Sequence, residues 1–186
     1  TGNPDLKQYY THSLTTRYSY TNVQNMNSVF ILLSGAITLD YIGNALLLAQ
    51  SDTLLEGGVL LKQGSQLSKP ANLGSQRTLR SMVNYSFPAS FIKSNLNLNL
   101  GFTYTSSPSL INNATNTSYS STLSPGLTLN SNISQELDFT LSYRANFNSV
   151  ENSVQANLDN KYFSHTASFR LNWIFWEGFV VRSDIR

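Results

Sequence analysis

The sequence predicts an all-β fold, namely the wall of an antiparallel transmembrane β-barrel with about eight consecutive strands. Three observations predict it: polar and apolar residues alternate, charges are few, and short connections alternate with long ones. The alternation is clearest in the run Asn-Leu-Asn-Leu-Asn-Leu-Gly-Phe-Thr-Tyr-Thr, from Asn95 to Thr105. A period of two places one set of side chains on each face of a strand, as expected where one face meets lipid and the other meets water.

The composition supports this fold class and excludes several others. Only 12% of the 186 residues are charged, about half of the roughly 25% in a typical soluble protein. Asn, Ser and Thr supply the polarity instead, and no window approaches the ~20 apolar residues of a membrane helix. A net charge of +2 without a Lys/Arg run gives no support for nucleic-acid binding. The chain has no cysteine, so disulfides and thiolate metal sites are excluded.

Alternation, β-branched and aromatic residues, and turn residues together predict eight strands in chain order. They cover residues 9–22, 28–43, 72–87, 91–106, 116–133, 136–148, 162–175 and 178–186. The register of the second strand stays open, because residues 29–33 are apolar on both faces. A short loop helix within residues 41–55, which are rich in Leu and Ala, is the alternative there.

The connections between these strands alternate in length. The short ones are residues 23–27, 88–90, 134–135 and 176–177, and the long ones are 44–71, 107–115 and 149–161. In an antiparallel meander, alternate connections lie at opposite ends of the sheet. Outer-membrane barrels have short periplasmic turns and long extracellular loops, so the pattern predicts this orientation. Within the first long connection, residues 52–69 are a candidate ligand-contacting lid or protein-packing segment.

Aromatic residues are expected to form two girdles at the membrane interfaces, where one part of a ring is apolar and the other wet. Those beside the short turns are Tyr20, Phe30, Phe87, Phe91, Trp173, Phe175 and Trp176. Those toward the long connections are Tyr9, Tyr10, Tyr41, Phe102, Tyr104, Tyr119, Tyr143, Phe147, Tyr162 and Phe163.

Parity along the last three strands predicts which charged side chains face the barrel interior. The candidate lumen-facing residues are Glu136, Asp138, Arg144, Arg170, Arg182 and Asp184. In these strands the charges fall on one parity, while the other carries residues such as Leu141, Phe169 and Val181. An Arg or Lys on the lipid face at mid-membrane would cost about 2–4 kcal/mol, which explains the segregation.

Several segments resemble a known family. The start, Thr1-Gly2-Asn3-Pro4-Asp5-Leu6-Lys7, resembles the entry into a wall strand in barrels of TonB-dependent receptors. Further segments are similar to the large outer-membrane β-barrel family of Bacteroidota. They are Leu67-Ser68-Lys69-Pro70-Ala71-Asn72-Leu73, Lys93-Ser94-Asn95-Leu96, Ser107-Pro108-Ser109-Leu110-Ile111-Asn112, Tyr162-Phe163-Ser164-His165-Thr166-Ala167-Ser168 and Asn172-Trp173-Ile174-Phe175-Trp176-Glu177-Gly178-Phe179.

The resemblance implies the C-terminal part of a 22-stranded, TonB-dependent-receptor-like barrel in the bacterial outer membrane. Residues 1–186 would then be one partial barrel domain, truncated at both ends. The implied activity is uptake of a nutrient, and the alternative is a structural or docking subunit of a larger envelope complex. The expected partners are the lipid bilayer and lipopolysaccharide, an N-terminal plug domain and TonB, and a surface lipoprotein or envelope-complex protein.

The sequence predicts no enzyme and no cofactor. The sequence contains no GxSxG elbow, P-loop, GxGxxG fingerprint or HExxH helix. Glu136 and Asp138 would lie about 7 Å apart on one strand face, a spacing compatible with a carboxylate pair or cation site but more typical of a hydrated interior balanced by arginines. His12 and His165 have lipid-facing parity in different strands; interfacial placement is the preferred interpretation and a metal pair the alternative.

Overall fold

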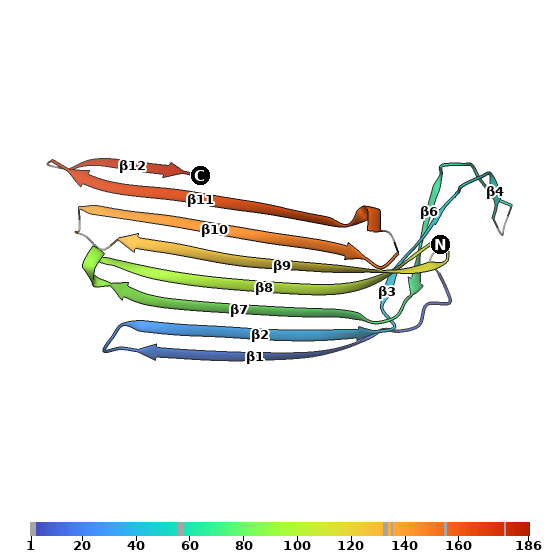
Figure 1. Cartoon of the computed structure of the whole chain (residues 1–186), viewed down its shortest axis with the longest axis horizontal. Helices are drawn as coiled ribbons and strands as arrows, with labels where there is room; N and C mark the ends of the chain where they lie inside the picture. Colours follow the sequence, from blue (N-terminus) through green and yellow to red (C-terminus); the bar gives the residue numbers. More distant parts are fainter. Residues whose placement is uncertain (1–2, 56–57, 132–133, 135, 155, 177) are drawn as a thin grey trace.

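The computed structural model of the chain is an all-β molecule built around one large antiparallel sheet (Figure 1). It describes residues 3–55, 58–131, 134, 136–154, 156–176 and 178–186. The strands follow one another across the sheet in the order β1-β2-β7-β8-β9-β10-β11-β12. Their bounds are β1 Tyr10–Asn22, β2 Asn27–Leu39, β7 Gln76–Ala89, β8 Ser94–Ile111, β9 Ala114–Ser131, β10 Leu137–Asn152, β11 Asn160–Phe175 and β12 Phe179–Ile185.

These strands confirm the positions of all eight predicted segments, with corrections at the ends. Because β2 ends at Leu39, Gly43, expected at the end of the second strand, belongs to the next strand instead. β8 and β9 are longer than expected, with 18 residues each. β1 and β12 pair with a neighbour on one side only, so the sheet is open along both edges.

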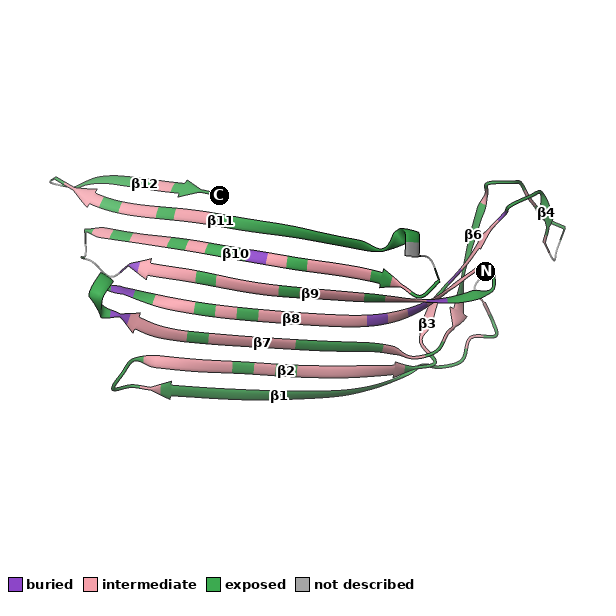
Figure 2. Ribbon diagram, viewed as in Figure 1, coloured by how far each residue is buried: buried purple, intermediate pink, exposed green. Residues whose placement is uncertain are grey.

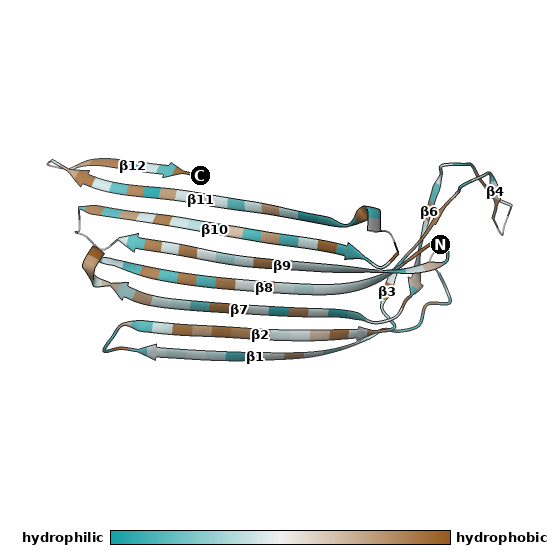
Figure 3. Cartoon of the chain, in the orientation of Figure 1, coloured by the Kyte–Doolittle hydropathy of each residue, from teal (hydrophilic) through white to brown (hydrophobic). Residues whose placement is uncertain are grey.

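The register gives the sheet two chemically different faces. Leu98 pairs with Leu127 and Tyr85, and the same row continues through Tyr143 of β10. One position along each strand, Asn97 pairs with Thr128 and Ser86. We call the first side the apolar face and the second the polar face. Figure 3 shows the alternation as bands of contrasting hydropathy, clearest along β8 and β10.

Side-chain contacts confirm this division. Hydrogen bonds between side chains of paired residues gather on the polar face, for example between Ser142 Oγ and Ser168 Oγ at 2.6 Å and from Thr122 Oγ1 to Asn148 Oδ1 at 2.8 Å. Ring contacts gather on the apolar face, as between Trp173 and Phe175, whose centroids are 4.9 Å apart. The second strand obeys the same rule, with Val29, Ile31 and Leu33 on the apolar face.

The register of β2, which the sequence left open, places two large apolar side chains on the polar face. Phe30 pairs with Asn84 and Ser19, and Leu32 pairs with Met82 and Arg17, so both side chains lie on the polar face. Phe30 is therefore placed wrongly in the predicted girdle. Tyr162 is a second correction, because it pairs with Asn148 on the polar face. Where residues at both odd and even positions are apolar, as in residues 29–33, alternation cannot predict which side chains face which side.

Near its end toward the long connections, the apolar face carries several polar and charged side chains along one row of paired residues. That row runs through His12, Ile37, Arg77, Ser106, Tyr119 and Glu151. Lys161 lies one row nearer the centre, where its Nζ is 3.0 Å from Glu151 Oε1. The charged side chains Arg77, Glu151 and Lys161 on this face thus gather near this end.

In the part of the chain that the structure describes, neither face of the sheet is covered by a second layer. Among the described residues, the buried apolar side chains are four alanines, and large apolar residues such as Leu100 (46% exposed) and Trp173 (45%) remain accessible. Figure 2 shows the same pattern, with exposed and half-exposed residues along nearly every strand. A domain with a conventional core would pack its apolar sheet face against another element.

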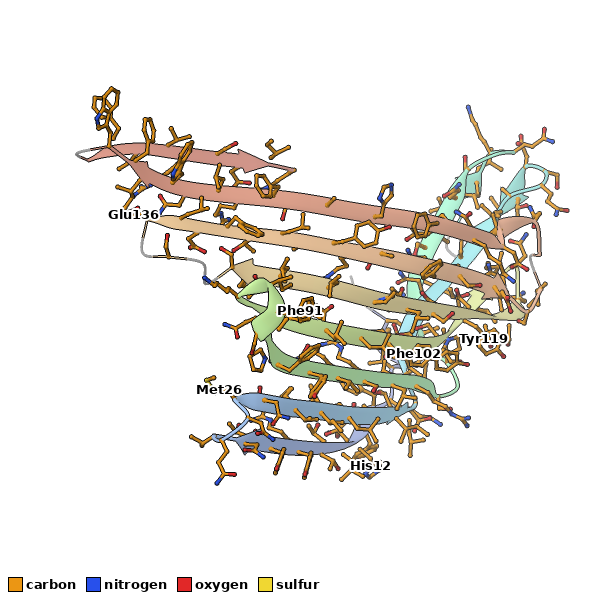
Figure 4. All side chains as sticks on the ribbon, turned by 60° about the vertical axis from the view of Figure 1, so that its left-hand side comes forward. His12, Met26, Phe91, Phe102, Tyr119 and Glu136 are labelled. Carbon is orange, nitrogen blue, oxygen red and sulfur yellow. The ribbon has the colours of Figure 1, made fainter. Side chains whose placement is uncertain are left out.

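The short connections lie together at one end of the sheet, as predicted (Figure 1). Figure 4 places Met26, Phe91 and Glu136 at this end, and Tyr119 and His12 toward the other. Between β7 and β8 the turn is a short 3-10 segment, Ser90–Ile92. Residues 135 and 177 of the other short links lie outside the described residues, as do residues 132–133 at the expected end of the fifth strand.

The predicted long connections are corrected in three ways. Residues 107–115 are not a loop, because β8 and β9 continue to a two-residue turn at Asn112 and Asn113. Both residues have positive φ, 47° and 64°, which is the geometry of the type I′ hairpin turn that Asn favours. The third connection shortens to residues 153–159, which include the 3-10 turn Ala156–Leu158.

The first long connection folds into an arm rather than a loop. β3 (Ile42–Leu48) and β6 (Gln66–Asn72) pair along their lengths, and β4 (Thr53–Leu54) and β5 (Leu60–Leu61) pair near the tip. β3 therefore replaces the alternative of a helix in this segment. The arm rises from the sheet at the end of the long connections (Figure 1).

The arm docks on the tip of the β8–β9 hairpin. Ala45 and Leu46 pair in parallel with Leu110 and Ile111, the Asn112 amide donates to the Leu46 carbonyl at 2.9 Å, and the Leu48 amide donates to Asn112 Oδ1 at 2.7 Å. Gly43 at the base of the arm is closely packed, because an added Cβ would come within 2.7 Å of Leu73 Cδ1.

Candidate functional site

Five of the six predicted lumen-facing residues lie on the polar face of the last three strands. Asp138 pairs with Asn172, which pairs with Arg182, and in the next row Arg170 pairs with Asp184. Arg144 shares the face further along β10, opposite Thr166. Glu136 precedes β10, at the end of the sheet that carries the short turns (Figure 4).

Four of these residues meet in one groove. It has a volume of about 460 Å³ and is lined by Asp138, Arg170, Leu171, Asn172, Arg182, Ser183 and Asp184. Asp184 lies between two guanidinium groups: its Oδ2 is 3.4 Å from Arg170 Nη2, and its Oδ1 is 3.4 Å from Arg186 Nε. Arg182 Nε donates to Asn172 Oδ1 at 3.3 Å.

The charges in this groove are balanced and exposed. The side chains of Arg170 and Asp184 are 66% and 42% exposed, so water weakens their attraction, and such ion pairs contribute little to stability. Asp138 accepts a hydrogen bond from Ser131 Oγ at 3.3 Å. The groove is thus a hydrated lining whose cations are already matched with acceptors.

The structure does not join Glu136 and Asp138 into a working pair of carboxylates. Asp138 lines the groove, whereas Glu136 is not among its lining residues. Within the part of the chain that the structure describes, no three His, Asp or Glu side chains cluster in a way that could hold a metal ion.

The two histidines are confirmed on the apolar face but far apart. His12 is in β1 and His165 in β11, with five strands of the sheet order between them; at about 4.8 Å per strand spacing this is about 29 Å along the sheet. His165 instead packs among rings, 5.5 Å from Phe163 and 5.9 Å from Tyr143 between centroids. This separation excludes the alternative of a shared metal site.

Sequence reasoning missed one feature of the polar face. Gly126 pairs with Asn99, and an added Cβ at Gly126 would collide with the Asn99 side-chain amide. The signal was the Pro-Gly pair inside an otherwise alternating strand, because glycine in a strand interior often marks close approach of another group.

Among the described residues, no helix is both long and apolar enough to cross a membrane. Comparisons of the chain with protein-family models, with curated proteins and with solved structures found no match.

Proposed function

We propose that this sheet is part of the wall of an outer-membrane barrel of the TonB-dependent-receptor type, and that the whole protein takes up a nutrient. The observation that carries the proposal is the exposed apolar face, whose charged side chains gather near the long connections. An apolar face of this extent needs a non-aqueous partner. A bilayer supplies one without a second layer of protein.

The dimensions of the apolar face support a membrane. On β10 the apolar positions run from Leu137 to Phe147, which is about 33 Å at roughly 3.3 Å per residue. A strand tilt of about 40° would reduce this to about 25 Å, the height of the apolar band in outer-membrane barrels. The strands extend beyond it toward the arm, as the walls of such barrels do when they carry extracellular loops.

The polar face supports the role of an interior lining. It combines Asn, Ser and Thr with the matched charges of the groove at Arg170 and Asp184, and polar interiors line the water-filled lumens of outer-membrane barrels. In this proposal the polar face and the arm contact the ligand, and transport involves no covalent step and no resident cofactor.

The barrel itself is tested by heat-modifiable migration on a denaturing gel. The protein is recovered from the outer-membrane fraction of its native cell and run with and without boiling. We expect an unboiled band that migrates differently, because a closed barrel resists the detergent. Recovery in the soluble fraction, or one band under both conditions, contradicts the proposal.

Transport is distinguished from the alternative, a docking subunit of an envelope complex, by the complete gene. The transporter proposal expects a plug domain and a TonB-binding segment upstream of Thr1, with the plug and TonB as partners. In the docking alternative the arm would contact the partner protein, because its tip exposes Leu54 (70%), Val59 (60%) and Leu60 (53%). A gene without a plug would favour docking to a surface lipoprotein or another envelope protein.

A further inference from the structure

A second pocket on the polar face surrounds Arg144. It has a volume of about 300 Å³ and is lined by Asn99, Thr128, Ser142, Tyr143, Arg144 and Thr166. The polar side chains come from four adjacent strands, β8 to β11. Gly126 lies between two of these residues, because it pairs with Asn99 on one side and with Arg144 on the other.

Arg144 differs from the arginines of the neighbouring groove. Arg170 and Arg186 form ion pairs with Asp184, and Arg182 donates to Asn172. In the described part of the chain, Arg144 has no ion pair and no side-chain hydrogen bond. Its guanidinium carries a positive charge and offers a planar set of donors.

Among the residues that the structure describes, no carboxylate forms an ion pair with this cation. The rows on either side of Arg144 contain Ser142 with Ser168, and Asn146 with Ser164. On the same strand, Asp138 is six residues away, or about 20 Å along the strand. Asp184 is paired with Arg170 and Arg186, so neither carboxylate neutralises Arg144.

The neighbours of Arg144 supply further donors. Because Gly126 has no side chain, the Asn99 amide lies over β9, on the side of the sheet where Arg144 projects from the next strand. Thr128 and Thr166 add hydroxyls at the edge of the pocket. A guanidinium with an amide and hydroxyls around it is the donor set that carboxylate and phosphate oxygens accept from.

We propose that this pocket binds an oxyanion, a carboxylate or phosphate group carried by a small polar ligand. Arg144 holds two oxygens of the anion through its planar fork, and Asn99 donates from across Gly126. The inference rests on the proposed function in one respect, since it names the ligand class that an uptake barrel would receive at its interior face.

The test measures binding to the complete protein in detergent micelles by calorimetry at constant ionic strength. The probes are glucuronate, inorganic phosphate and, as a neutral control, glucose. We expect glucuronate or phosphate to bind and glucose not to bind. The tighter of the two anions identifies the source of the oxyanion.

Two substitutions remove parts of the pocket. We expect Arg144→Gln to weaken anion binding at least tenfold, because it removes a charge-assisted pair of hydrogen bonds. Asn99→Ala should weaken it several-fold. Arg80→Gln is the matched control, because Arg80 lies on the same face, opposite Ser34 and Thr103, and outside the pocket.

Equal binding by Arg144→Gln and Arg80→Gln would overturn the assignment, as would equal binding of glucose and glucuronate. Heat-modifiable migration of each variant is measured in parallel. A variant that keeps its barrel but loses the anion supports the pocket. If anion binding depends on Arg144 but no barrel is found, only the proposed function fails.

Discussion

A residue's parity within its strand decides what a substitution there costs. Leu141 and Ser142 are neighbours in β10, yet Leu141 pairs with Phe169 on the apolar face and Ser142 with Ser168 on the polar face. On the proposed orientation, the first side chain contacts lipid and the second contacts water. The same new charge should therefore have very different effects at the two positions.

We expect Leu141→Arg to lower the free energy of unfolding in lipid vesicles by about 2–4 kcal/mol, the cost of an arginine near the bilayer midplane. Ser142→Arg should cost at most about 1 kcal/mol, mainly from the lost hydrogen bond to Ser168. Urea titrations of both variants measure the difference. Equal losses would mean that the apolar face does not meet hydrocarbon.

At the scale of elements, the alternation predicts strands well and hairpin ends poorly. The parity of β10 to β12 was confirmed from residues such as Asp138, Arg170 and Arg182, because a one-residue slip would turn every side chain to the wrong face. Composition misled at Ser107 to Thr115, where Asn, Ser and Pro suggested a loop. The Asn112-Asn113 pair carried the correct signal, since a type I′ turn needs two residues with positive φ.

The candidate site was predictable only in part. Its residues follow from parity, but the groove at Asp184 and the pocket at Arg144 depend on which strands are neighbours and on cross-strand register. The arm could not be predicted from the sequence for the same reason. β3 pairs with β6 and β8 through contacts that are distant in sequence, and no local pattern encodes them.

The turn at Asn112 and Asn113 offers a direct test of hairpin geometry. Asn113→Val should destabilise the protein by about 1–2 kcal/mol, because a β-branched residue strains at φ near 64°. Asn113→Gly, the matched control, should be neutral or slightly stabilising. Chemical denaturation of both variants compares them; equal stability would contradict the turn.

The arm is inserted between two strands that are already neighbours. Thr38 pairs with Gln76, and the Tyr41 amide donates to the Gly74 carbonyl at 3.1 Å. We expect that replacing residues 40–74 with an Asn-Gly turn leaves heat-modifiable migration unchanged, because the β2–β7 ladder sets its own register. Loss of the modifiable band would show that the arm is needed to form the sheet.

At the scale of the whole molecule, an open single-layer sheet with one polar and one apolar face is not expected to be stable in water alone. The large residues of its apolar face remain accessible, and unpaired edges at β1 and β12 invite further strands. A closed barrel in a bilayer would resolve both problems, because lipid covers the apolar face and closure removes the edges.

The two tryptophans allow the lipid contact to be measured. With Trp176→Phe, Trp173 on the apolar face should be strongly quenched by lipids brominated on their acyl chains. The comparison protein carries Asn172→Trp with both native tryptophans changed to Phe, so that its only indole lies on the polar face. Similar quenching of the two proteins would contradict the assignment of the faces.

The parallel pairing of β3 with β8 also sets an order of events. The arm is synthesised before β8, yet its docking partners Leu110 and Ile111 belong to the hairpin that follows. Contacts between distant segments form slowly because the chain between them must first be ordered. We therefore expect the arm to dock only after β8 and β9 have paired. Pulse-labelled hydrogen exchange should then show protection of the Asn112 amide later than protection along the centre of that hairpin.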